Sequence, residues 1–136
     1  VHLCRGRVEP RNTDVATFYD RLLPVLGNAD FRDGAWTLIP PCQAWDANPT
    51  WQDFVAYAWQ APDGGRHVVV VNYSDHQAQC HLRLPFAGLA GGKFRLVDAM
   101  GSEVYDRDGA SLVDPGLFID LAAWRYNVFT LETVGP

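Results

Sequence analysis

Hydrophobic residues follow a helical period near the start of the chain. Over residues 12–28 they recur every three or four positions, which places them on one face of a helix. Asn12 or Thr13 can cap the first turn, and Pro24 is expected to end or kink the helix. The pattern predicts one α-helix over residues 14–26. Its apolar stripe consists of Val15, Phe18, Tyr19, Leu22 and Leu26.

After this helix the pattern changes to short strands separated by turn residues. The run HVVVV at 67–71 is apolar at every valine, so we expect a central strand covered on both faces. In QCHLRL, Cys80, Leu82 and Leu84 should face the core, because alternate residues of a strand point to the same side. The last apolar stretch should form two strands with a corner near 122–123. About eight such strands predict an all-β fold, an antiparallel two-sheet β-sandwich of the Greek-key type with one N-terminal α-helix.

The composition is that of a folded domain and argues against several classes of partner. The chain has 136 residues, of which 48% are hydrophobic, enough to build a core. The net charge is −5 and the arginines are scattered, so we expect no nucleic-acid binding. We also expect no membrane association, because there is neither a basic stripe suited to anionic lipid nor an apolar run of roughly 20 residues.

The cysteines indicate a reducing compartment. Cys4, Cys42 and Cys80 are odd in number, widely spaced and without a CxxC motif. We interpret them as reduced thiols of a cytoplasmic protein, with one disulfide plus one free thiol as the alternative. The chain begins VHLCRGRVEP, without a methionine or a secretory signal, which suggests a piece of a longer protein.

Motifs for catalysis or metal binding are weak. The segment DRDGAS resembles the first half of a calcium loop, but the glutamate that would complete the loop is missing. The four histidines lack the spacing of a zinc site. Asp46, Asp98 and Asp120 could form an acid–base pair only if the fold brought two of them together. We therefore predict no metal site and no cofactor.

Four of the five tryptophans fall within residues 31–60, and they divide into two pairs. Trp36 and Trp59 lie on predicted strands and are expected to be mostly core residues. Trp45 and Trp51 lie in the loop QAWDANPTWQD, whose composition suits either a sugar-binding platform or a loop packed on a neighbouring domain. In the sugar-binding alternative, the residues that would hold hydroxyl groups are Asp46, Asn48 and Gln52.

The order of several segments resembles the C-terminal end of α-amylase-family enzymes, glycoside hydrolase family 13. These segments are FYDRLLPVLGNADFRDGAWTLI, WDANPTWQDFVAYAWQ, GGRHVVVVNYSDHQAQCHLRLPF and YDRDGASLVDPGLFIDLAAWRYNVFTLE. The order of FRDGAW before VVVVNYS is the most specific feature. The resemblance covers the chain from about Asp14 onward.

In that family a catalytic (β/α)8 barrel is followed by an all-β sandwich. The resemblance implies that residues 1–30 are the C-terminal remnant of the barrel, with its last helix at about 14–26. The loop out of the last barrel strand would be residues 1–10, and residues 31–136 would form the sandwich domain. The motifs around the family's catalytic aspartates and glutamate are absent from this sequence, so no catalytic residue is carried over.

The resemblance thus implies a non-catalytic domain of an enzyme that acts on α-glucans. Its partner would be the catalytic barrel of the same polypeptide, which the domain would stabilise. The alternative is a carbohydrate-binding accessory module that stacks α-glucan on the loop tryptophans. Many family members have only a short polar connection where this chain has Trp45 and Trp51, and this difference keeps the alternative open.

Overall fold

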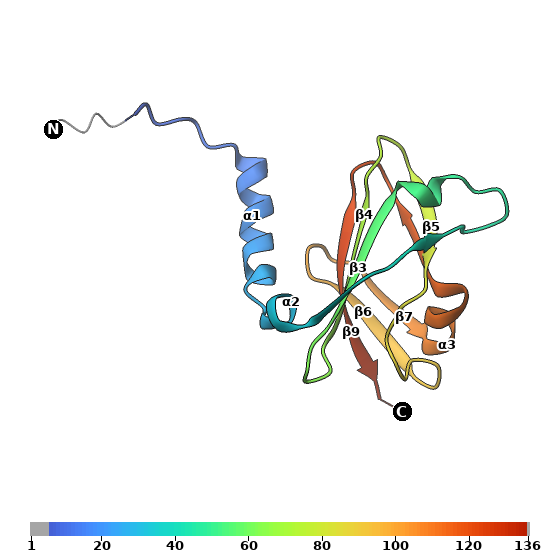
Figure 1. The fold of residues 1–136 in the computed structure, drawn as a ribbon. Coiled ribbons are helices and arrows are strands. Elements are labelled where there is room, and N and C mark those ends of the chain that lie inside the picture. Colours follow the sequence, from blue (N-terminus) through green and yellow to red (C-terminus); the bar gives the residue numbers. More distant parts are fainter. Residues whose placement is uncertain (1–5, 136) are drawn as a thin grey trace.

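The computed structural model describes residues 6–135. Cys4 and the first half of the predicted loop at 1–10 lie outside the described residues. In Figure 1 the strands form two layers, and the helix α1 stands beside them, joined to the first strand through the short helix α2. The chain runs directly from α2 into β1, which is an edge strand of the sheet.

All strand pairs are antiparallel and form two sheets. The larger sheet has the order β1 (Ala35–Leu38), β3 (Phe54–Gln60), β4 (Arg66–Asn72), β9 (Tyr126–Val134), β6 (Lys93–Asp98) and β7 (Val104–Asp108). The smaller sheet has the order β2 (Pro41–Cys42), β5 (Ala78–Leu82) and β8 (Leu117–Leu121). The last strand, β9, lies between β4 and β6, so sheet neighbours are not always sequence neighbours, as in Greek-key folds. These sheets confirm the predicted all-β sandwich.

Strand β4 is an interior strand, as its valine run predicts. It pairs with β3 on one side and with β9 on the other. Val68 and Val70 are fully buried between the sheets, while Val69 and Val71 are half-buried on the outward face. The alternation in β5 is also as predicted, with Cys80 buried and its polar neighbours turned outward. The two strands predicted around residues 122–123 are β8 and β9.

The predicted helix is present as α1 (Thr13–Leu26). The side chain of Asn12 caps it by accepting hydrogen bonds from the N–H groups of Asp14 and Val15, each at 3.1 Å. The helix continues through Pro24 for two further residues, so the proline does not end it at once. Proline has no N–H group to donate, so α1 lacks one intrahelical hydrogen bond at this position.

Four short helical segments were not predicted. They are α2 (Ala29–Asp33), η1 (Thr50–Asp53), α3 (Gly109–Ser111) and the irregular turn η2 (Leu112–Gly116). Asn28 caps α2 by accepting from the N–H of Asp30 at 3.0 Å. Segments of three to five residues carry too little periodicity to be recognised from a hydrophobic pattern.

Candidate docking surface

Strand β3 is apolar on both faces, and the packing of the sheets decides which face is core. Its two alanines are buried between the sheets, whereas Tyr57 and Trp59 point outward. Strand β1 extends this outward surface, because Trp36 pairs with Trp59 and Leu38 pairs with Tyr57. We call the outward set the outer aromatic face; it consists of Trp36, Leu38, Val55, Tyr57 and Trp59.

The prediction that Trp36 and Trp59 are mostly core residues is wrong. Trp36 is 54% exposed, and Trp59 is half-buried on the outward side of the sheet. The rings of this face contact one another instead of the core. The ring centroid of Tyr57 lies 5.6 Å from that of Trp36 and 6.0 Å from that of Trp59. When the residues on both faces of a strand are apolar, the sequence does not show which face packs against the second sheet.

The short helix α2 covers one end of this face. The ring of Phe31 packs against Trp59 and His67, with centroids 5.3 Å and 4.7 Å apart. The Oδ2 atom of Asp30 lies 2.6 Å from Nε2 of His67, which is only 3% exposed. The other ring nitrogen of His67 lies 3.1 Å from the hydroxyl of Thr130. A buried polar side chain needs such partners, so this pair anchors α2 to β4.

Helix α1 carries an apolar stripe that the sandwich does not cover. No residue of α1 is buried. Its exposed large apolar residues are Val15, Phe18, Tyr19, Leu23 and Leu26. The ring of Phe18 contacts Tyr126 at the start of β9, edge to face, with centroids 5.8 Å apart. Figure 1 shows the helix standing clear of the strands. Amphipathic helices normally bury such a stripe. The apolar residues of α1 and the outer aromatic face together therefore form an exposed surface on which another domain or protein could pack.

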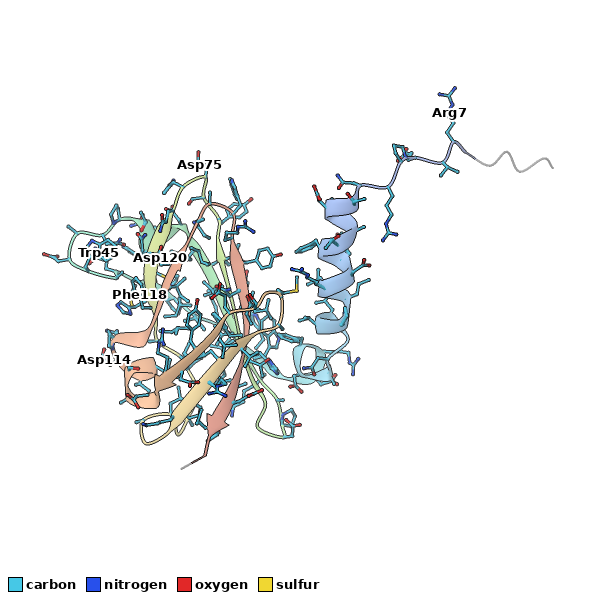
Figure 2. All side chains as sticks on the ribbon, turned by 180° about the vertical axis from the view of Figure 1, so that it is seen from behind. Arg7, Trp45, Asp75, Asp114, Phe118 and Asp120 are labelled. Carbon is cyan, nitrogen blue, oxygen red and sulfur yellow. The ribbon has the colours of Figure 1, made fainter. Side chains whose placement is uncertain are left out.

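The five candidate sugar-binding residues lie in different environments. Trp45 is 54% exposed, and Asp46 and Gln52 are exposed as well. Asn48 is buried and its amide hydrogen-bonds to a threonine hydroxyl within the loop at 3.2 Å. Trp51 is half-buried against the core. The loop therefore displays one ring and two polar side chains. In Figure 2 Trp45 lies on the side of the sandwich away from α1.

The carboxylates singled out from the sequence have separate surroundings. Asp98 is buried on β6 and accepts hydrogen bonds from two backbone N–H groups and from Asn127. Asp120 lies on β8, in the other sheet, and accepts from two glutamine side chains. Asp46 is exposed in its loop. Among residues 6–135, no three histidine, cysteine or acidic side chains are grouped so that they could hold a metal ion.

Both cysteines that the structure describes are free thiols. Cys80 is buried in the core, and its burial, together with nearby Cys42, raises the pKa of its thiol to about 12. The thiol of Cys80 therefore stays protonated at neutral pH and is a poor nucleophile. In the part of the chain that the structure describes, no helix has the length and apolar character needed to cross a membrane. The cytoplasmic location stays a prediction.

The turn after β4 contains a histidine held between two carboxylates. Nδ1 of His76 lies 3.0 Å from Asp75 and Nε2 lies 2.9 Å from Asp53. The hydrogen bond to Asp75, and then that to Asp53, raises the pKa of His76 above its ordinary value. A raised pKa in the folded state favours folding below the unfolded-state value of about 6.5, and the benefit is lost as the pH rises through the folded-state pKa.

We therefore expect the ring signals of His76 to titrate in NMR spectra with a midpoint above 6.5. Asp75→Asn should lower this midpoint, because it replaces the carboxylate that contributes most. Asp63→Asn, in the turn at the other end of β4, serves as a control that should leave it unchanged. Stability should change little, since the ring is exposed. If Asp75→Asn left the titration midpoint of His76 unchanged, Asp75 would not be the carboxylate that raises its pKa most.

One structural connection was missed in the sequence because its parts are far apart. Asn72 ends β4 and is fully buried, and its amide donates to backbone carbonyls of both the 73–77 and the 121–125 turns. These two turns carry the exposed rings of Tyr73 and Trp124, whose centroids are 5.5 Å apart. An asparagine directly after an apolar strand was the one local signal for this connection.

Comparisons with known proteins assign no family. No family model matches the sequence, and no curated protein matches it. Among solved structures, one match is a crystal structure described as a "putative alpha-N-acetylgalactosaminidase" from Bacillus halodurans C-125. The TM-score is 0.47 and the sequence identity is 18%, over 70% of this chain. This chain covers 20% of the length of that structure. Because no family model matches, the resemblance to the α-amylase family stays a hypothesis.

Proposed function

We propose that this chain is a non-catalytic β-sandwich domain that packs on the catalytic (β/α)8 barrel of the same polypeptide. The parent enzyme would belong to the α-amylase family and act on α-glucans. The observation that carries the proposal is the uncovered apolar surface formed by α1 and the outer aromatic face. In the parent polypeptide α1 would be the last barrel helix, and the outer aromatic face would lie against the barrel.

The energetics favour a covered surface. Burial of apolar area contributes roughly 25 cal/mol per Å², so an interface of about 400 Å² would contribute on the order of 10 kcal/mol before entropic costs. The pair of Asp30 and His67 supports a defined placement, because it fixes α2, and with it the start of β1, on the sheet. A docking surface needs this rigidity, since ordering a loose helix would consume part of the gain.

Trp36 and Trp45 provide a matched test, because each is 54% exposed and they have different roles in the proposal. We expect Trp36→Lys and Trp45→Lys to change the melting temperature of the isolated chain by only a few degrees, as surface substitutions usually do. In the parent polypeptide, Trp36→Lys should lower the melting temperature of the barrel strongly, because it buries an unpaired charge at the interface. Trp45→Lys should not. Differential scanning calorimetry measures these melting temperatures for each variant, both as the isolated chain and within the parent polypeptide.

Leu23→Asp on α1 extends the test to the helix. Leu23 is exposed here, so the isolated chain should tolerate the change, whereas a barrel that packs on this stripe should not. The proposal would be overturned if Trp36→Lys and Leu23→Asp left the parent polypeptide as stable as Trp45→Lys does.

The proposal also makes a prediction about activity. The isolated chain should release no reducing sugar from starch or maltooligosaccharides, because the family's catalytic motifs are absent from its sequence. The measurement is a reducing-sugar assay on pure protein over several hours, with the parent enzyme as positive control. Hydrolysis that disappears on a single substitution, such as Asp98→Asn or Asp120→Asn, would show that the chain is an enzyme in its own right.

The alternative function, a carbohydrate-binding module, is supported by the exposure of Trp45, Asp46 and Gln52 in one loop region. A single exposed ring contributes about 1 kcal/mol beyond its area, so binding would be weak, with a Kd in the millimolar to high micromolar range. Titration with maltoheptaose, followed by tryptophan fluorescence or NMR shifts, tests it. Saturable changes that Trp45→Ala abolishes and Trp36→Ala retains would favour this alternative.

A further inference from the structure

The two sheets have unequal widths, and this leaves a cleft at one edge of the sandwich. The larger sheet has six strands and ends at β7, whereas the smaller sheet has three and ends at β8. A cleft of about 280 Å³ lies between β8 on one side and β7 and β9 on the other. Figure 2 places Phe118 and Asp120 of β8 on the side away from α1, so the cleft is distinct from the docking surface.

One wall of the cleft is the free backbone edge of β8. All five residues of this strand, Leu117–Leu121, line the cleft. Their side chains alternate between the buried and the outward face of the smaller sheet, so the five side chains cannot all face the cleft. The part of β8 that all five residues present to the cleft is its backbone edge. The described residues pair β8 with β5 alone. Every second residue of β8 therefore directs its N–H and C=O groups away from β5.

The opposite wall comes from alternate residues of β7. Tyr105 and Arg107 point inward and are half-buried. The guanidinium of Arg107 lies over the Tyr105 ring, 5.1 Å from its centroid, and that ring packs against Phe129 at the floor, 5.9 Å between centroids. The hydroxyl of Tyr105 donates to Glu103 at 2.8 Å. The wall is therefore apolar in the middle, with a basic end and an acidic end.

We propose that this cleft binds an extended peptide, which pairs with β8 as a fourth strand of the smaller sheet. An unpaired strand edge offers a row of backbone donors and acceptors that an extended chain satisfies without any special sequence. A guest strand in this position would cover the half-buried side chains of β7 and complete the second layer of the sandwich. Its alternate side chains would point into the cleft, toward Phe129.

The charged residues of the wall, together with antiparallel pairing, specify which side chains the bound peptide needs and in which direction it runs. The α3–η2 segment connects the end of β7 to the start of β8, so Arg107 lies at the Leu117 end of the cleft and Glu103 at the Leu121 end. All strand pairs among the described residues are antiparallel, and an antiparallel guest would run from Glu103 toward Arg107. Glu103 and Arg107 are four positions apart, about 13 Å along a strand. The guest motif is thus a basic residue, an apolar residue two positions later, and an acidic residue two positions after that.

The test uses two labelled peptides with the cores Lys-Thr-Val-Thr-Glu and Glu-Thr-Val-Thr-Lys, capped at both ends. The full chain should bind the first in fluorescence anisotropy with a Kd on the order of 100 µM, and at least several-fold tighter than the second. Amide hydrogen exchange should slow at alternate residues of β8. Arg107→Glu should weaken binding about five- to tenfold, whereas the matched control Arg83→Glu, directly after β5 and outside the cleft, should have no effect.

A charge exchange keeps the test decisive if one variant loses stability. The double variant Glu103→Lys/Arg107→Glu should prefer the second peptide over the first, which loss of fold cannot produce. The proposal is overturned if neither peptide binds at 1 mM peptide, roughly ten times the expected Kd. Equal binding of both peptides without protection of β8 would overturn it too, as would displacement of the first peptide by maltoheptaose, which would assign the cleft to sugars.

Discussion

Val70→Asp is expected to lower the free energy of unfolding by about 5 kcal/mol, which is enough to unfold much of the protein at 25 °C. Val70 is fully buried on β4, and its neighbours across the strand pairs are Ala56 and Asn127. A carboxylate in this position would be removed from water without a cation to pair with, which is among the largest destabilising effects of a single substitution. Urea unfolding followed by circular dichroism measures the loss.

The control for this prediction is Val69→Asp, the same change one residue earlier. Val69 faces outward and is half-buried, so the new carboxylate keeps contact with water and should cost only a fraction as much. The pair separates a burial effect from the poor strand propensity of aspartate, which both variants share. If both lost the same amount of stability, or if Val70→Asp unfolded like the parent, the position of the core between the sheets would be wrong.

Gly109→Ala is expected to cost about 2–4 kcal/mol, which for a chain of this size lowers the melting temperature by roughly 10 °C. Gly109 follows β7 and is buried, and its N–H donates to the carbonyl of Gly92 at 2.8 Å. A Cβ atom there would lie only 1.7 Å from the carbonyl oxygen of Leu89. This atom belongs to the backbone, so the loop that leads into β6 would have to move.

Gly91→Ala provides the matched control in the neighbouring loop. A Cβ atom at Gly91 would have no other atom within 4 Å. The change should therefore be neutral or slightly stabilising, because alanine restricts the unfolded chain more than glycine does. Calorimetric melting of both variants tests the pair. Equal melting temperatures would mean that the close approach of residues 89 and 109 is not a feature of the folded protein.

Local features of the fold could be predicted from the sequence because they depend on the spacing of apolar residues. Helix α1 and its stripe follow from a period of 3.6 residues, and Asn12 supplies the cap. Strand β4 could be identified as an interior strand because four successive valines are apolar on both faces. The alternation in β5 predicted that Cys80 faces the core. In each case the pattern lies within one segment of the chain, and the tertiary packing is consistent with it.

Features that depend on contacts between distant segments were decided by the tertiary structure alone. Both faces of β3 are apolar, and the alanine face became core because the second sheet packs there, so that Ala56 and Ala58 join the same buried cluster as Phe129 and Leu82. Trp36 and Trp59 were therefore left outside. The pair of Asp30 and His67 joins residues that are 37 positions apart, and no local pattern encodes such a contact.

The candidate sites also fall into two groups: those that a local sequence pattern identifies and those that only the tertiary structure shows. The sequence by itself identified the apolar stripe of α1 and the loop tryptophans Trp45 and Trp51 as candidates, because helix period and loop composition are local properties. Only the structure shows that Trp45 is exposed and Trp51 is half-buried. The sequence could not identify the cleft beside β8, which exists only because three strands pack against six. The number of strands in each sheet, and thus which edge stays unpaired, is set by how all strands share the apolar surface they must bury. That balance is a property of the whole chain, so only the folded structure displays it.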